Sequence, residues 1–258
     1  MTRPAGEEFR LARMTSPEIA QAAQAGGRPL AVMPVGAIEQ HGPHLSVGVD
    51  IRLATAVAEA AVERTPGCYL AAPLPYGVSP HHRDFAGTMS LGAPTFVAIL
   101  SELGGNLWED GFLPVFLNGH GGNRPALGVA VSTLGAGGVT SAAITYFEHI
   151  ADTAADVLPD AAGGTGHAGA LETSLMMYVA RAEVRPDAIP PGRTPDGWPD
   201  PHLYAGPAPT IWRPFSGINP TGVVGTPSDA SEGAGKTLFE VATDRTSDLL
   251  SRIKHNYG

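Results

Sequence analysis

The sequence predicts one α/β domain, residues 1–258, with three layers (α/β/α) in which helices cover both faces of a mainly parallel sheet. Short apolar runs of strand length alternate with helical patterns, and this alternation implies right-handed crossovers between parallel strands. The hydrophobic content of 43% is high and the charged content of 16% is low, and 258 residues are long enough to bury one well-packed core. Polar residues follow each predicted strand, which places a ligand site off the carboxyl ends of the strands.

Two strands, a helix and a loop are predicted in the first third of the chain. Residues 30–35 have the length of a buried strand, and residues 51–64 have the apolar spacing of an amphipathic helix, which a Pro-Gly pair stops. Residues 68–74 form a second apolar strand. The segment 75–84 is too polar, and too broken by proline and glycine, to be anything except a loop.

Two more helices and two more strands follow in alternation. The predicted helices cover 94–109 and 124–134, and the predicted strands cover 112–117 and 141–147. A glycine-rich loop, 118–123, follows the third strand. Every predicted strand therefore ends beside histidines or carboxylates, which is the edge at which parallel sheets bind ligands.

A long loop separates the last two predicted helices, which cover 170–181 and 229–255. Residues 186–228 are rich in proline and lack periodicity. Loops of this length are usually functional or disordered. The segment contains two tryptophans, Trp198 and Trp212, which favour a packed excursion over the site rather than a linker.

Charge and hydropathy exclude several classes of partner. The net charge of −9 leaves no basic stripe for a phosphate backbone or an anionic membrane, so nucleic acid is not an expected partner. No run approaches the ~20 apolar residues of a membrane span, and the first thirteen residues lack the apolar region of a signal peptide. A cytoplasmic protein that acts on small molecules or peptides is expected.

The single cysteine, Cys68, lies within an apolar run. One cysteine excludes an internal disulfide and a cysteine-based zinc site. Nothing basic flanks Cys68 in the sequence, so a buried structural role is favoured over a nucleophile.

The first candidate ligands follow the first strand. Glu39 and His41 are two residues apart, so in an extended segment both side chains leave the same face. Asp50 comes eleven residues after Glu39, just before a helical pattern. Carboxylates and imidazoles suit a divalent metal ion. The same residues alone are also compatible with a solvated loop, and Asp50 with the N-cap of a helix that begins at Ile51.

Two further loops carry candidates. His120 is flanked by glycines directly after a buried strand, where the backbone can come close to a ligand. Its loop, 118–123, has neither the Walker pattern nor the dinucleotide fingerprint, which disfavours phosphate binding. His167 lies between a glycine and an alanine, five residues before Glu172. A core histidine remains the alternative for both imidazoles.

Seven of the nine histidines fall in or beside loops that follow strands, namely His41, His44, His81, His82, His120, His149 and His167. The five candidates Glu39, His41, Asp50, His120 and Glu172 together supply three carboxylates and two imidazoles. This set is enough for two metal ions if one carboxylate bridges them, and Asp50 is the expected bridge. Zinc, manganese and iron all suit such ligands.

The order of these motifs resembles that of the creatininase (creatinine amidohydrolase) family. The similarity covers about residues 30 to 240 and rests on four stretches, namely Glu39-Gln40-His41-Gly42-Pro43-His44-Leu45 with Asp50, Asn118-Gly119-His120-Gly121-Gly122-Asn123, His167-Ala168-Gly169 with Glu172-Thr173-Ser174, and Thr221-Gly222-Val223-Val224-Gly225. The resemblance implies a three-layer α/β hydrolase, often a hexamer. Its two metal ions would activate a water that cleaves a C–N bond of an amide.

The resemblance also implies a role for each candidate. Glu39, Asp50 and His120 would hold the first metal ion, and His41 with the bridging Asp50 the second. His167 would be the acid and base near the substrate. Two further residues, Ser79 and Gly121, would contact the substrate.

One departure from the family pattern affects the second ion. Creatininase itself has tyrosine and glutamate where this chain has Gly121 and Gly122, and that glutamate binds the second metal. The ligand must then come from elsewhere, and Glu172 is the candidate. Creatininase also has a tryptophan just before the histidine that corresponds to His167, and this chain has glycine and threonine there.

These departures make creatinine one of several candidate substrates. The glycine-rich variant resembles family members that act on formamides and the peptidase of mycofactocin maturation, so another amide or a short peptide is favoured. The alternative from a different class is a binding protein that kept the metal site and lost turnover. Intact Glu39, His41, Asp50, His120 and His167 argue against it.

Overall fold

The computed structural model describes residues 7–24, 26–158, 166–192 and 212–258. Its centre is a four-stranded sheet in which every pair of neighbouring strands is parallel and the order is β2-β1-β3-β4. The strands are β1 (Leu30–Val35), β2 (Cys68–Leu70), β3 (Leu113–Asn118) and β4 (Ala142–Thr145). The predicted α/β class with a parallel sheet is confirmed.

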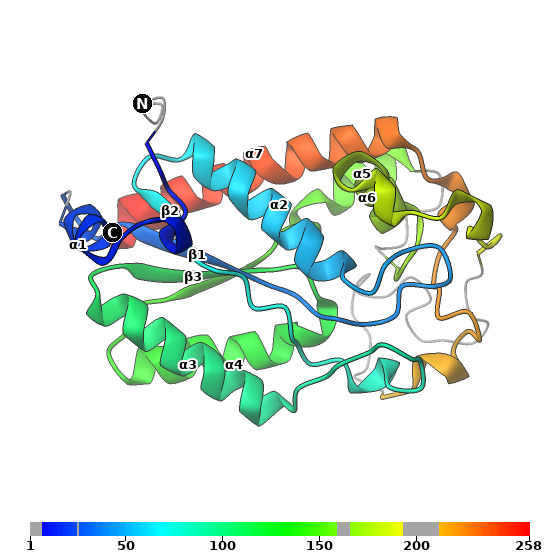
Figure 1. The fold of residues 1–258 in the computed structure, drawn as a ribbon, viewed down its shortest axis with the longest axis horizontal. Coiled ribbons are helices and arrows are strands. Elements are labelled where there is room, and N and C mark those ends of the chain that lie inside the picture. Colours follow the sequence, from blue (N-terminus) through cyan, green and yellow to red (C-terminus); the bar gives the residue numbers. More distant parts are fainter. Residues whose placement is uncertain (1–6, 25, 159–165, 193–211) are drawn as a thin grey trace.

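Helices cover both faces of the sheet (Figure 1). One layer holds α2 (Val49–Arg64), α5 (Ala151–Val157), α6 (Ala170–Val179) and α7 (Glu232–Tyr257), with α7 packed on α2 and α6. The opposite layer holds α3 (Ala93–Glu109) and α4 (Arg124–Ala136), which pack on each other. The short helix α1 (Ser16–Ala23) precedes β1. None of the helices in the described ranges is both long and apolar enough to span a membrane.

Short 3-10 helices connect these elements. Those before α5 are η1 (Leu11–Arg13), η2 (Pro80–His82), η3 (Gly121–Asn123) and η4 (Tyr146–Ile150). Those after α6 are η6 (Arg181–Glu183), η7 (Pro186–Ala188), η8 (Phe215–Gly217) and η9 (Pro227–Asp229). Two of them, η2 and η8, contact each other although far apart in the sequence.

The central strands divide the core into two clusters. All six residues of β1 and of β3 are buried, as expected for strands covered on both faces. Side chains of a strand alternate between its two faces. In β3, Val115 and Leu117 therefore pack in the cluster under α2 and α7, and Phe116 packs in the cluster under α3 and α4.

The two central strands also define where a ligand can bind. The chain leaves β1 for β2 on one side and later returns to β3 on the other side. Parallel sheets bind ligands outside the carboxyl ends of strands at such a switch point. A Cβ on Gly36, after β1, would lie 2.5 Å from the amide nitrogen of Ile51, and one on Gly119, after β3, would lie 2.4 Å from the carbonyl oxygen of Asp50. These two glycines therefore let the first turn of α2 contact both strand ends.

Several predicted bounds were wrong. The second strand ends at Leu70 rather than at residue 74, because the prolines that follow cannot donate to the ladder, although Leu74 still bridges to Val35. The fourth strand ends at Thr145 and continues as the 3-10 helix η4. The helices α1 and α5 were not predicted. Of the proline-rich segment 186–228, residues 193–211 lie outside the described part, and Trp198 with them.

Candidate metal centre

Three carboxylates from three different elements face one small cavity. Glu39 lies in the loop after β1, Asp50 in the first turn of α2, and Glu172 in the first turn of α6. Glu39 and Asp50 are 1% and 2% exposed. Gly48, not Asp50, is the N-cap of α2, so the carboxylate of Asp50 is free for another role. A helix N-terminus favours negative charge, which supports the ionised state of Asp50 and Glu172.

Asp50 links two imidazoles through different oxygens. The Nδ1 atom of His41 donates to the carbonyl oxygen of Glu39 at 3.1 Å, and its Nε2 atom lies 3.1 Å from Oδ1 of Asp50. The Nε2 atom of His120 donates to the carbonyl oxygen of Val78 at 3.1 Å, and its Nδ1 atom lies 3.1 Å from Oδ2 of Asp50. A carbonyl oxygen only accepts, so each histidine turns its second nitrogen to the carboxylates. Metal-binding histidines are held in this way.

His167 has the same arrangement. Its Nε2 atom donates to the carbonyl oxygen of Gln40 at 2.8 Å, and its Nδ1 atom lies 3.7 Å from Oε1 of Glu39. Paired backbone hydrogen bonds between His167 and Val224 fix the position of the loop that carries it. The free nitrogen of His167 therefore faces the same cavity as the carboxylates.

Glu172 is held by the loop that precedes α6. Its Oε2 atom accepts a hydrogen bond from the amide of Ala168, whose φ of 52° places that residue in the left-handed region. Its Oε1 atom lies 3.8 Å from Nε2 of His41. One oxygen thus keeps the loop in place while the other faces the imidazole that also contacts Asp50.

Several buried carboxylate oxygens have no hydrogen bond to any described residue, namely both oxygens of Glu39 and Oδ2 of Asp50. Imidazole nitrogens lie 3.1–3.3 Å away, but without the geometry of a hydrogen bond. Burying an unpaired carboxylate is costly, so a cation is the natural partner. Three donor groups bring one ligand atom per residue within 4.8 Å of the others, namely Glu39–His81–His120, Glu39–His41–His167 and His41–Asp50–Glu172. The residues present therefore fit divalent metal ions.

The charges in the cavity change the pKa values of its members. Burial alone would lower the pKa of His41, but Asp50 and Glu172 raise it well above the ordinary range. Burial would also lower the pKa of His120, but Glu39 and Asp50 raise it well above the ordinary range. Burial would likewise raise the pKa of Glu39, but His120 and His82 hold it below the ordinary range. The carboxylates of the cavity thus favour the protonated form of His41 and His120.

Two histidines of η2 border the cavity and were not among the predicted ligands. The Nε2 atom of Gln40 donates to Nδ1 of His82 at 2.9 Å, so the protonated Nε2 of His82 faces Oε1 of Glu39 at 3.3 Å. The Nε2 proton of His82 is therefore on the side of Glu39, although the pair lacks the geometry of a hydrogen bond. Burial lowers the pKa of the neighbouring His81 to about 4, so its imidazole is neutral. The histidine-bearing loop after the second strand was the available signal for both residues.

An aromatic side chain from the proline-rich segment lines the cavity. The ring of Phe215, in η8, lies 4.0 Å from that of His82 and 4.9 Å from that of His167, between centroids. The cavity is lined by Glu39, Asp50, His81, His82, Gly119, His120, Gly121, Tyr146, Phe147, Gly166, His167, Leu171, Glu172 and Phe215. No periodicity or motif in the sequence singles out Phe215. This part of the predicted excursion nevertheless contacts the site.

The remaining candidates occupy different places. Gly121 lines the cavity, as a substrate contact would. Ser79 is not a lining residue. It is fully buried with its Oγ 3.2 Å from Nε2 of His120, and its substrate role stays a prediction. His44 bonds to the hydroxyl of Thr173 and is not a lining residue. His149 borders a separate surface groove.

Comparisons with known proteins agree with this geometry. The sequence model of the creatininase family, described as creatinine amidohydrolase, matches residues 12–250. The chain belongs to the creatininase family. A mycofactocin precursor peptide peptidase of Mycobacterium ulcerans (strain Agy99) is 36% identical over 236 residues, which are 87% of this chain and 84% of the relative. The creatinine amidohydrolase of Pseudomonas putida is 28% identical over 253 residues, which are 89% and 92% of the two chains.

Solved creatininases have the same fold. A structure described as "Creatininase Mn" superposes with a TM-score of 0.80 at 25% identity, covering 97% of this chain and 99% of the other. Another, a mutant creatininase described as "Zn-Zn type", gives a TM-score of 0.79 at 24% identity with the same coverage. The relatives of this creatininase-family chain are named as hydrolases of amide or peptide bonds. The chain itself has a cluster of potential metal ligands at the corresponding α/β fold.

Proposed function

We propose that the protein hydrolyses the C–N bond of a small amide or short peptide, with two divalent metal ions per chain. One observation carries the proposal. Asp50 contacts His41 and His120 through different oxygens, while its Oδ2 and both oxygens of Glu39 are buried without a hydrogen bond among the described residues. Ligands that share a bridging carboxylate in this way suit two neighbouring ions.

Each ion has a donor set. Glu39, Asp50 and His120 would hold the first ion, and His41, Asp50 and Glu172 would hold the second. Carboxylate and imidazole donors suit zinc, manganese or iron. When bound, such ions supply an activated water and polarise the carbonyl group that is attacked.

His167 is proposed as the acid and base. Its Nε2 proton is held by the carbonyl oxygen of Gln40, so proton transfer must use Nδ1, which faces the cavity. Burial lowers the pKa of His167, so its imidazole starts neutral and can accept a proton. Nδ1 would take a proton from the water that attacks the amide carbon. It would then give this proton to the leaving nitrogen as the C–N bond breaks.

The cavity wall bears on the substrate class. Gly121 and Gly166 line it without side chains, and Phe147, Leu171 and Phe215 add apolar surface. At position 121 this chain has glycine where creatininase itself has tyrosine, and it lacks the tryptophan that in creatininase comes just before the histidine corresponding to His167. We therefore favour linear amides or short peptides over creatinine, and one relative bears the name of a peptide peptidase. A homo-oligomer, hexameric by family resemblance, is part of the same proposal and is tested by sedimentation velocity.

Elemental analysis followed by a substrate screen tests the proposal. The purified protein, loaded with Zn²⁺ or Mn²⁺, is incubated with small amides, formamides, creatinine and short peptides, and released amine is measured. The expected result is up to two ions per chain and turnover of a linear amide or peptide that is lost on chelation. A protein that retains two ions but cleaves none of these classes would favour the non-catalytic metal-binding alternative.

A further inference from the structure

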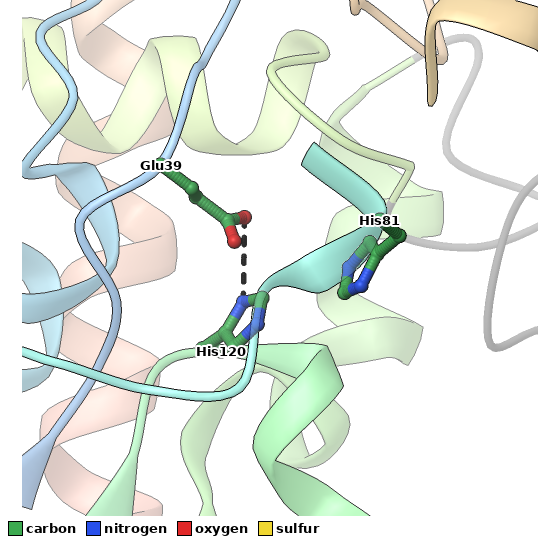
Figure 2. Close-up of side chains that lie close together, drawn as sticks. All are labelled: Glu39, His81 and His120. Atoms are coloured by element: carbon green, nitrogen blue, oxygen red, sulfur yellow. Dashed lines mark ion pairs between the residues drawn. The ribbon is translucent and has the colours of Figure 1, made fainter. Parts of the chain in front are cut away.

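We infer that His81 supplies an additional ligand to the ion held by Glu39 and His120. The inference rests on the proposed metal centre and extends it to a residue from η2. The structure brings a ligand atom of His81 within 4.8 Å of ligand atoms of both Glu39 and His120. Figure 2 shows the three side chains reaching one region from the loop after β1, from η2 and from the loop after β3.

The distances between these ligand atoms are close to those around one shared ion. A zinc–nitrogen bond is about 2.0–2.1 Å long, so two ligand atoms of one tetrahedral ion lie about 3.3 Å apart. Glu39 Oε1 and His120 Nδ1 are already 3.3 Å apart. His81 is half-buried and lines the cavity, and one of its ring nitrogens lies within 4.8 Å of the ligand atoms of the other two residues.

The ring nitrogens of His81 are available. The ring packs parallel to that of His120, with centroids 5.8 Å apart, and against His82 and Phe215. Among the described residues, neither nitrogen of His81 has a hydrogen-bond partner. The adjacent His82 differs, because Gln40 occupies its Nδ1 and Glu39 faces its Nε2. Of the two neighbours, only His81 has a lone pair to offer an ion.

The lack of a side chain at Gly122 leaves space for the imidazole of His81 beside that of His120. A Cβ at this position would lie 2.5 Å from Nε2 of His120, 2.9 Å from Cε1 of His81 and 2.4 Å from the carbonyl oxygen of Val78. The space above Gly122 is therefore filled by the two imidazoles. The loop after β3 offers no further ligand from position 122, and the ring of His81 stands over it.

Competition with a chromophoric chelator measures the affinity of both ions in the complete protein. His81→Ala should weaken binding of one ion by about 100-fold or more, since loss of an outer partner alone typically costs 10–100-fold. His81→Glu keeps a donor of similar reach and should restore most of the affinity. His149→Ala removes a histidine outside the cavity and should bind both ions as the unchanged protein does.

Cobalt substitution adds a readout independent of turnover. The visible absorption of bound Co²⁺ depends on its ligands, so His81→Ala should change the spectrum of one ion and His149→Ala should not. Unchanged affinities and spectra in His81→Ala, with two ions bound to the unchanged protein, would overturn this inference alone. If the unchanged protein bound no ion, the proposed function itself would fail. Melting curves of the metal-free variants check that each one folds.

Discussion

The Nε2 atom of His167 donates to the backbone carbonyl oxygen of Gln40 at 2.8 Å, which leaves only Nδ1 to face the carboxylates. The two residues are far apart in the sequence, so the tautomer of His167 is set by the tertiary fold. Nδ1 lies near Glu39 and within a donor group that includes His41. His167 is therefore placed either to transfer a proton or to hold an ion, and the two roles predict different results.

His167→Ala should leave the metal content near two per chain and lower kcat by roughly 10²–10⁴, the usual contribution of a general acid or base. Elemental analysis and steady-state kinetics on the same preparation measure both quantities. Loss of one ion in this variant would instead make His167 a ligand. His44→Ala removes a buried imidazole that bonds to Thr173 outside the cavity lining, and it serves as the control for metal content.

Asp50→Ala should remove both ions, because one carboxylate faces His41 with one oxygen and His120 with the other. The measurement is metal per chain after dialysis, with folding checked by circular dichroism. Asp152→Ala removes an exposed carboxylate that pairs with Arg245 and should leave metal content unchanged. Full metal content in Asp50→Ala would refute the bridging role.

Glu172→Gln separates a metal ligand from a loop anchor. The glutamine keeps an oxygen that can accept from the amide of Ala168, but it loses the charge near His41. Metal content should fall towards one per chain and most activity should disappear, while the melting temperature at saturating metal changes little. A variant with two ions and near-normal turnover would show that Glu172 only holds the loop, and the second ion would then need another ligand.

Metal binding should release protons and strengthen as the pH rises. The carboxylates raise the pKa of His41 and of His120 well above the ordinary range, so both imidazoles are protonated in the metal-free protein at neutral pH. An ion needs their unprotonated form, so each bound ion displaces protons. Affinity should therefore increase with pH until these pKa values are passed. Calorimetry in two buffers of different ionisation enthalpy measures the protons released, and a value of zero would contradict the assignment.

Replacing either of two helical glycines with alanine should change the free energy of unfolding in opposite directions. A Cβ on Gly235, in α7, would lie 1.9 Å from the carbonyl oxygen of Ser174 in α6, so Gly235→Ala should lower the free energy of unfolding by at least about 1–3 kcal/mol. A Cβ on Gly105, inside α3, would meet no atom within 4 Å, so Gly105→Ala should raise it by about 0.5–1 kcal/mol. Urea denaturation of both variants tests the pair, and equal effects would contradict the close contact between α6 and α7.

The fold class follows from local patterns. Apolar runs such as 30–35 and 112–117 alternate with amphipathic helices, and strands covered on both faces have this composition. The bounds were less predictable. Helix α1 was not predicted although a capping box between Thr15 and Glu18 marks its start, because its single buried residue, Ala22, produces little periodicity.

The sequence alone determined the chemical types in the site. Glu39, His41, Asp50, His120 and Glu172 stand out because carboxylates and imidazoles follow predicted strands or begin helices, and parallel strands bring such positions to one edge. Only the tertiary structure decided which atoms of these residues face the cavity. A tautomer depends on a carbonyl oxygen from a distant segment, and no spacing along the chain encodes that contact.

The tertiary structure also decided which other residues join the cavity. His81 and His82 come from η2, and Phe215 comes from a segment without periodicity, yet their rings lie against each other. His44 follows the same strand as His41, but its Nε2 atom pairs with the hydroxyl of Thr173, whereas Nε2 of His41 faces Asp50. The physical reason is that local sequence sets which residues leave a strand end, whereas packing between remote segments sets which of their side chains share a space.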